Sequence, residues 1–241
     1  MTTFVLVHGA WQGPSTWDLV TPVLESKNHR VLPATLSGLG ARGYELSQEL
    51  TLDHHVNDIA GLFEYEDLEG AVLVGHSYAG SVITAAAERV ARRVKALVYI
   101  DAFVPQDGQA TLQLLPEPIR QTLKTMAQTH GDGWRLPGGE NLLDIWGLKD
   151  GPHRDFVRKK LCDFSIRFFE STVRLPGAAG GATRLKRAYI SCVAEDYPGR
   201  PAFAPFASVA KQGGWPYLEL PTGHDCHVER PREVAEFLMA Q

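Results

Sequence analysis

Short apolar segments alternate with amphipathic helical segments along most of the chain, and this alternation restricts the fold more than any other feature. The apolar segments cover 4–7, 31–32, 71–74, 96–100, 188–193 and 217–220. Such continuous runs are typical of strands buried on both faces of a sheet. Helical patterns follow them over 17–26, 53–64, 77–90, 201–211 and 232–239. Strands that alternate with helices form parallel sheets, so the sequence predicts an α/β fold of about six parallel strands flanked by helices.

The alternation stops at Pro105 and resumes near residue 186. The segment between contains no convincing strand, but it has helical patterns over 117–129 and 154–173 and loops rich in Pro and Gly, one of them over 174–182. We interpret this long insertion as a cap over a site. The prediction is one core domain, formed by 1–104 and 186–241, with a helical cap over 105–185 inserted after the fourth strand.

Composition excludes several classes of protein. The net charge of −4 argues against a nucleic-acid partner, which would require a basic stripe. Cys162, Cys192 and Cys226 are odd in number and widely spaced, which favours a reducing cytoplasm over a disulfide framework. No apolar run approaches the roughly 20 residues of a membrane-spanning helix, and the N-terminus lacks a signal-peptide pattern. We therefore expect a cytoplasmic monomer or homodimer without a membrane or nucleic-acid partner.

A serine stands where one predicted strand passes into a helix, in the order Gly75, His76, Ser77, Tyr78, Ala79. A serine in such a tight turn has a strained backbone, and small residues two positions before and after it prevent a collision. Gly75 and Ala79 are these residues, with alanine replacing the more usual glycine. The turn would expose Oγ of Ser77 at the carboxyl end of the sheet, near the positive end of the helix. We predict that Ser77 is a nucleophile; the alternative is a simple helix cap.

The sequence resembles the α/β-hydrolase superfamily, and within it the branch of plant methylesterases, salicylate-binding esterases, hydroxynitrile lyases and bacterial carbendazim-type hydrolases. The residues that carry the resemblance lie at 4–11 (FVLVHGAW), 75–80 (GHSYAG), 97–105 (LVYIDAFVP) and 222–231 (TGHDCHVERP). The resemblance covers nearly the whole chain and is weakest in the expected cap. It implies an α/β-hydrolase fold and a triad in the order Ser, acid, His.

The resemblance implies that His224, after the last strand, is the base; the alternative is His227, one turn further from the end of that strand. The acid has two candidate places. Asp196, or Glu195 beside it, follows the penultimate strand, where the superfamily more often has its acid, but plant members have an Asp where this chain has Glu195. Asp101 follows the strand next to that of Ser77, and we prefer it because a carboxylate buried there needs a partner.

The same resemblance implies an oxyanion hole formed by the N–H groups of Ala10 and Tyr78. Trp11 lies beside this loop and is the preferred substrate-pocket residue. Further apolar candidates in the expected cap, each also consistent with ordinary core packing, are Trp134, Trp146, Phe164 and Phe168.

These features predict a serine hydrolase that cleaves small-molecule carboxylic esters through an acyl-enzyme, with carbamates and amides as further candidates. The sequence contains no metal-ligand cluster and no dinucleotide motif, so no metal or cofactor is predicted. One alternative is a hydroxynitrile lyase, but the lysine that such relatives have after the triad histidine is Asp225 here. The other is a ligand-binding protein on a hydrolase scaffold.

Overall fold

A six-stranded sheet in which all neighbouring strands are parallel forms the centre of the computed structural model, which describes residues 1–175 and 184–241. The strand order is β2-β1-β3-β4-β7-β8. The strands are β1 (Thr3–Val7), β2 (Arg30–Ala34), β3 (Ala71–His76), β4 (Val94–Ile100), β7 (Lys186–Cys192) and β8 (Tyr217–Leu220). The predicted α/β fold with six parallel strands is confirmed, and each strand segment predicted from the sequence overlaps one of these strands.

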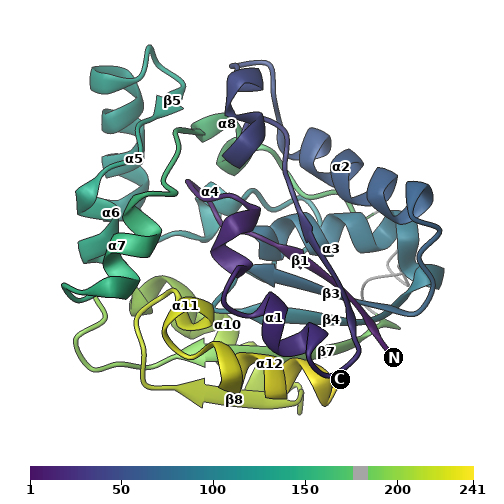
Figure 1. Ribbon diagram of the computed structural model, residues 1–241. Helices are drawn as coiled ribbons and strands as arrows, with labels where there is room; N and C mark the ends of the chain where they lie inside the picture. The colour runs from purple at the N-terminus through teal and green to yellow at the C-terminus, as the bar shows by residue number, and fades with distance from the viewer. Residues whose placement is uncertain (176–183) are drawn as a thin grey trace.

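Helices flank the sheet in two groups (Figure 1). In one group α1 packs on α12; in the other α2 packs on α3, which lies against β3 and β4, while α10 lies against β7. The helices of these groups are α1 (Thr21–Glu25), α2 (Leu52–Tyr65), α3 (Ala79–Val90), α10 (Arg200–Gln212) and α12 (Pro231–Met239). Shorter helical segments outside the cap are η1 (Pro14–Trp17), η2 (Gly40–Glu45), η3 (Ala91–Arg93) and α11 (Cys226–Glu229). No helix in the described part of the chain is long and apolar enough to cross a membrane.

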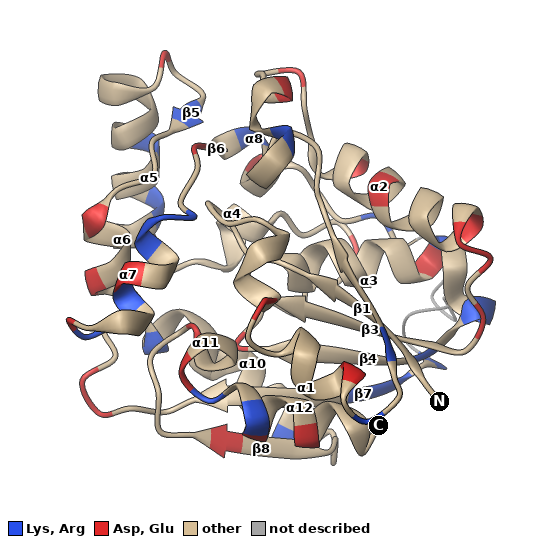
Figure 2. Cartoon of the chain, viewed as in Figure 1, with Lys and Arg blue, Asp and Glu red and all other residues tan. Residues whose placement is uncertain are grey.

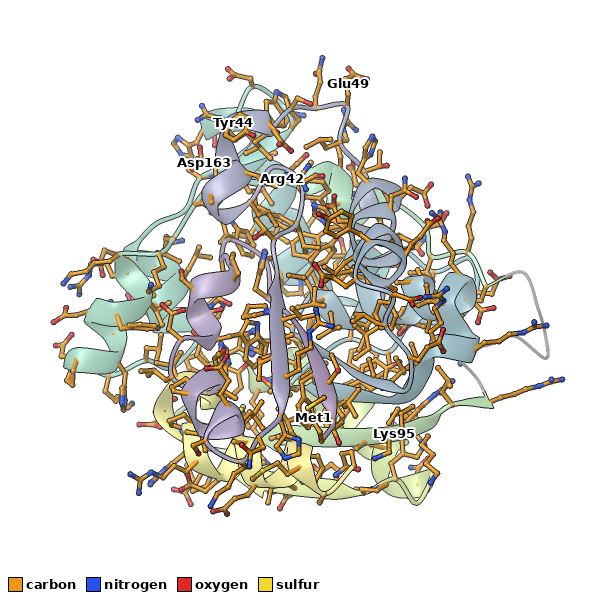
Figure 3. The ribbon with its side chains drawn as sticks, turned by 45° about the vertical axis from the view of Figure 1, so that its right-hand side comes forward. Met1, Arg42, Tyr44, Glu49, Lys95 and Asp163 are labelled. Carbon is orange, nitrogen blue, oxygen red and sulfur yellow. The ribbon has the colours of Figure 1, made fainter. Side chains whose placement is uncertain are left out.

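Because the strands are parallel, their amino ends all lie along one side of the sheet and their carboxyl ends along the other, which we call its carboxyl edge. Met1 and Lys95 lie at the amino end of the strands, whereas Arg42 and Asp163 lie at the opposite end of the molecule (Figure 3). The loops that follow β1, β3, β4, β7 and β8 therefore meet at the carboxyl edge, which is where open α/β sheets bind ligands. β3 is buried along its whole length because helices cover both of its faces.

Between β4 and β7 the described residues form a helical segment that contains a short β pairing. Its helices are α4 (Thr111–Leu114), α5 (Glu117–His130), α6 (Glu140–Ile145), α7 (Pro152–Arg158) and α8 (Ile166–Glu170). β5 (Arg135–Leu136) pairs antiparallel with β6 (Phe164–Ser165), so the expectation of no strand in this segment was wrong. Of the Pro- and Gly-rich loop expected over 174–182, all but the first two residues fall within 176–183, outside the described residues.

The single helix predicted over 154–173 is broken in the structure. α7 ends at Arg158, and α8 begins only at Ile166. Between them, the N–H of Cys162 donates to the carbonyl of Trp11 at 2.9 Å, and Phe164 pairs with Leu136. The backbone of this stretch bonds to other segments, which replaces the i to i−4 bonds that a continuous helix needs. The helix predicted over 17–26 is shorter in the structure, where α1 covers only Thr21–Glu25 and η1 ends at Trp17.

Charged residues of both signs are interspersed on α5, α6 and α7 (Figure 2). Arg154, for example, pairs with Glu140 at 3.1 Å and with Asp144 at 2.8 Å. Because the two acidic side chains are largely exposed, such pairs contribute little to stability. The segment is held mainly by its buried apolar side chains, which include Leu123, Leu142, Leu143, Val157 and Phe164.

Candidate active site

Ser77 lies in a strained turn directly between β3 and α3, with a backbone φ of 57°. A Cβ at Gly75 would stand 2.8 Å from the carbonyl oxygen of Ala79, and a Cβ at Gly80 would stand 2.0 Å from that of Phe103. The turn therefore requires glycine at positions 75 and 80, whereas the side chain of Ala79 is accommodated. The sequence pattern places the second small residue at Ala79, but the tighter contact is at Gly80.

His224 and Asp101 meet at the carboxyl edge of the sheet. Nδ1 of His224, on the loop after β8, is 2.7 Å from Oδ2 of Asp101, which directly follows β4. Both side chains are only 2% exposed. The backbone N–H of Asp101 donates to the carbonyl of Ile190 at 2.7 Å, and the N–H of Cys192 donates to Oδ1 of Asp101 at 3.3 Å. The neighbouring strand β7 therefore holds both the backbone and the carboxylate of Asp101.

The other candidate acids do not reach His224. Glu195 and Asp196 are exposed, and Asp196 forms an ion pair with Lys149. The loop after β7 instead turns Tyr197 inward, where its hydroxyl donates to Oδ2 of Asp101 at 2.9 Å. Sequence reasoning missed Tyr197. The sequence feature that could have indicated it is a tyrosine in the loop after β7, where the superfamily more often has its acid.

Burial dominates the electrostatics of this pair. It raises the pKa of Asp101 to about 7, although hydrogen bonds from Tyr197 and from the N–H of Cys192 and the charge of Arg200 oppose the change. Burial also lowers the pKa of His224 to about 3. Since the two groups are in contact, they take up a proton as a unit. Above about pH 7 the carboxylate is ionised and the imidazole is neutral, which is the state able to accept a proton.

The loop after β1 passes directly against the serine. A Cβ on Gly9 would lie 3.0 Å from Cβ of Ser77, and Ala10 and Trp11 line the same cavity as Ser77. Across residues 1–175 and 184–241, neither the N–H of Ala10 nor that of Tyr78 donates to a protein acceptor. Two N–H groups without a protein acceptor beside a serine are the donors that an oxyanion would need.

Hydrogen bonds of the Trp11 and Tyr78 side chains hold the loop after β1 and the turn after β3 in place. Nε1 of Trp11 donates to the carbonyl of Leu136 at 3.0 Å. The hydroxyl of Tyr78 lies 3.0 Å from Nδ1 of His55. Trp11 has a φ of 59°, so its strained backbone depends on such external contacts.

Ser77 and His224 line a cavity of about 100 Å³. Its lining consists of Ala10, Trp11, Ser77, Phe103, Leu115, Ile119, Leu123, Leu142, Ile145, Trp146, Phe169, Tyr197, Gly199, Ala202, Phe203 and His224. Of the aromatic residues singled out in the sequence, Trp11 and Trp146 line it, whereas Phe164 packs against Trp11 at a ring-centroid distance of 5.2 Å. Trp134 and Phe168 are not part of the lining. No Asp, Glu, Lys or Arg side chain is among the described residues that form it.

A buried polar cluster that the sequence did not predict lies behind His224. Ligand atoms of His76, Asp225 and His227 lie within 4.8 Å of one another. Oδ1 of Asp225 is 3.8 Å from Nε2 of His76 and 3.9 Å from Nε2 of His227. Two ligands of a tetrahedral zinc stand only about 3.3 Å apart. Nε2 of His76 is also 3.1 Å from the carbonyl of His224. The two separations are about 0.5 Å wider than this spacing, and Nε2 of His76 already has the carbonyl of His224 as a partner.

Comparison with known proteins identifies the class. The model of the alpha/beta hydrolase family matches residues 4–237, so this chain belongs to that family. It is 35% identical to the carbendazim hydrolyzing esterase of Nocardioides sp. (strain SG-4G) over 249 residues, which cover 100% of this chain and 99% of that protein. It is also 33% identical to salicylic acid-binding protein 2 of Nicotiana tabacum over 159 residues, which cover 66% of this chain and 59% of that protein.

Solved structures share the same fold. An extracellular alpha/beta-hydrolase from a Paenibacillus species superposes with a TM-score of 0.85 at 21% identity, covering 100% of this chain and 98% of that one. A pyrethroid hydrolase from Sphingobium faniae JZ-2 superposes with a TM-score of 0.78 at 22% identity, covering 99% and 96%. The resemblance stated from the sequence is thereby confirmed at the level of fold and family.

Proposed function

We propose that this chain is a serine esterase that hydrolyses neutral, apolar esters through an acyl-enzyme. The observation that carries the proposal is the contact between His224 and Asp101 at 2.7 Å, beside a strained serine that opens into an uncharged cavity. Sequence similarity over the full length of a carbendazim hydrolyzing esterase supports the same class of reaction.

In the proposed reaction His224 takes the proton of Oγ as Ser77 attacks the ester carbonyl. The ionised carboxylate of Asp101 then faces an imidazolium, which it stabilises while keeping the ring in one tautomer. The N–H groups of Ala10 and Tyr78 receive the charge on the carbonyl oxygen. His224 returns the proton to the leaving alcohol. Water, activated by the same imidazole, then releases the acid and regenerates Ser77.

The lining of the cavity restricts the substrate. A charged acid or amine entering this cavity would lose hydration without gaining a partner of opposite charge, which is costly, so neutral substrates are favoured. Aromatic rings of Trp11, Trp146 and Phe203 offer flat apolar contacts. Esters, carbamates and activated amides all satisfy this requirement, and we place esters first because the relative with full coverage is named an esterase.

The helical segment over 105–185 is the proposed cap. Leu115, Ile119, Leu123, Leu142 and Trp146 supply much of the cavity lining from this segment. Substrate selectivity would then depend on the cap more than on the core. A cytoplasmic location is also proposed, since Cys162, Cys192 and Cys226 are all unpaired.

The two alternatives have less support. A lyase that releases cyanide needs a cation near the leaving group, but the position after His224 holds Asp225, which is buried and accepts a bond from Gln12 at 2.8 Å. A pure binding protein has no need for a strained serine beside a carboxylate-bound imidazole.

A fluorophosphonate probe tests the proposal directly. We expect stoichiometric labelling of the wild-type protein at Ser77, located by mass spectrometry of the labelled peptide, and parallel hydrolysis of p-nitrophenyl butyrate. Ser77→Ala should lose both signals. Ser208→Ala, which changes an exposed serine of α10, should keep both. A folded wild-type protein that is neither labelled nor active would rule out the esterase.

A further inference from the structure

Tyr197 contacts both members of the acid-histidine pair. Its hydroxyl donates to Oδ2 of Asp101 at 2.9 Å and lies 3.0 Å from Nδ1 of His224. The side chain is only 3% exposed, and its ring stacks on the imidazole at a centroid distance of 6.0 Å. A phenol that is bound to both groups and shielded from solvent is placed to act on them together.

The direction of these bonds follows from the groups involved. An ionised carboxylate only accepts, so the phenol proton of Tyr197 is donated to Oδ2 of Asp101. Nδ1 of neutral His224 donates to the same oxygen at 2.7 Å. Oδ2 therefore receives two donors, whereas from the described residues Oδ1 receives only the weaker bond from Cys192 at 3.3 Å. Tyr197 supplies a large part of the hydrogen bonding available to this buried charge.

The position of the hydroxyl is fixed by close packing on Gly199. A Cβ at Gly199 would stand 2.7 Å from Cε2 and 3.0 Å from the hydroxyl oxygen of Tyr197. The N–H of Gly199 donates to the carbonyl of Ile145 at 3.0 Å, and the N–H of Tyr197 donates to that of Ala194 at 3.3 Å. The loop after β7 and the end of α6 thus clamp the phenol against Asp101.

We infer that Tyr197 is a positioning residue for the proposed hydrolysis: its hydroxyl holds Oδ2 of Asp101 against Nδ1 of His224 and keeps this carboxylate ionised. The inference rests on the proposed function, because it assigns Tyr197 a part in the same reaction. In this arrangement Asp101 comes from the end of β4, and the loop after β7, where relatives more often have the acid, contributes the phenol that supports it.

The charged and titratable groups around the pair determine how it responds to pH. Burial raises the pKa of Asp101 to about 7, and the bond from Tyr197 is the strongest of the contacts that oppose this rise. Groups that face the pair from the surrounding elements are Cys192 on β7, Arg200 on α10, His76 on β3, and Asp225, Cys226 and His227 after β8. Of these, Arg200 alone is a cation that lowers the pKa of Asp101. Removing the phenol should therefore raise the pKa of the pair.

The test is the pH profile of kcat/KM for Tyr197→Phe, measured with p-nitrophenyl butyrate at a wavelength where product absorbance does not depend on pH. We expect the acidic limb to move up by about one pH unit, the size expected for one lost hydrogen bond to a charged group. Activity should fall about fivefold at pH 7 and recover to nearly that of wild type at pH 9. The matched control is Tyr99→Phe, since Tyr99 is equally buried and bonds Thr84 at 2.8 Å, away from His224.

A uniform loss of activity across the pH range, with the limb unmoved, would overturn the inference and leave Tyr197 a packing residue. An inactive wild type would instead reject the proposed function itself, so the two failures are distinguishable. Gly199→Ala provides a second variant, because it displaces the hydroxyl without removing it. This variant should move the limb in the same direction. If the acidic limb of the pH profile does not move in folded Gly199→Ala and Tyr197→Phe, the positioning role of Tyr197 is wrong.

Discussion

Three residues with side chains hold left-handed backbone conformations at the ends of strands or in the loops that follow them. Trp11, Ser77 and Asp101 have φ values of 59°, 57° and 41°. Each such conformation costs about 1–3 kcal/mol in a residue that has a Cβ, and it persists only where neighbours enforce it. The N–H of Ser77 donates to Ile100 at 3.1 Å and that of Asp101 to Ile190 at 2.7 Å, so the sheet itself enforces two of the three.

The assignment of Asp101 leads to a prediction at a single position. Asp101→Asn keeps the shape of the side chain but removes the charge that faces His224, so kcat/KM should fall about a thousandfold or more. Asp196→Asn should remain within about threefold of wild type, because Asp196 is exposed and paired with Lys149. Both variants are measured with p-nitrophenyl butyrate. Near-wild-type rates for Asp101→Asn would mean that another group orients the imidazole.

Some of the candidate catalytic residues could be predicted from the sequence, and others could not. The strand-to-helix turn around Ser77 and the position of His224 after the last strand could be found because local spacing specifies them. The choice among Asp101, Glu195 and Asp196 stayed open because all three follow strands. Which of them meets His224 depends on how the loop after β7 turns, and that turn brings Tyr197 inward and leaves both acids exposed.

Hydrogen bonds connect the loop after β1 to the proposed cap. Nε1 of Trp11 donates to Leu136 of β5, and the carbonyl of Trp11 accepts from Cys162 next to β6. The β5 and β6 pairing therefore fixes the backbone beside Ala10. Sequence periodicity could not reveal this link, because a two-residue strand is too short to show a pattern, and the same link interrupts the helix predicted over 154–173.

Trp11→Phe tests this connection between elements. The variant keeps an aromatic ring in the cavity but loses the bond to Leu136, so the loop should be less well ordered. We expect about a tenfold lower rate of fluorophosphonate labelling and about 1 kcal/mol lower free energy of unfolding. Trp17→Phe is the matched control, since within residues 1–175 and 184–241 the buried Nε1 of Trp17 has no hydrogen-bond partner. Equal labelling rates in wild type and Trp11→Phe would show that the loop is held without this bond.

For the molecule as a whole, the parallel sheet explains why residues distant in sequence converge. β4 lies between β3 and β7, so Ser77 and Asp101 follow neighbouring strands, and the loop after β8 brings His224 back over both. Alternating apolar segments predict such a sheet, but they carry no information on the buried cluster behind His224. His76 ends β3, whereas Asp225 directly precedes α11 and His227 lies within it, so only the tertiary structure brings the three together.

This cluster makes the stability of the whole molecule depend on pH. Burial raises the pKa of Asp225 to about 7, whereas an unfolded aspartate titrates near pH 3.9. The folded state thus binds this proton more tightly than the unfolded state. The free energy of unfolding should fall as pH rises from about 4 to about 7, by at most about 4 kcal/mol from this group, and stay level above.

Asp225→Asn isolates that contribution. The amide keeps an oxygen for the bond that Nε2 of Gln12 donates at 2.8 Å, but it never becomes charged. Thermal unfolding followed by circular dichroism should show the variant melting above wild type at pH 8, with the difference shrinking toward pH 5. Asp196→Asn, which changes an exposed carboxylate, should show no comparable dependence. A gap that stays constant between pH 5 and pH 8 would show that Asp225 titrates in the folded protein as it does in the unfolded chain, and would contradict this prediction.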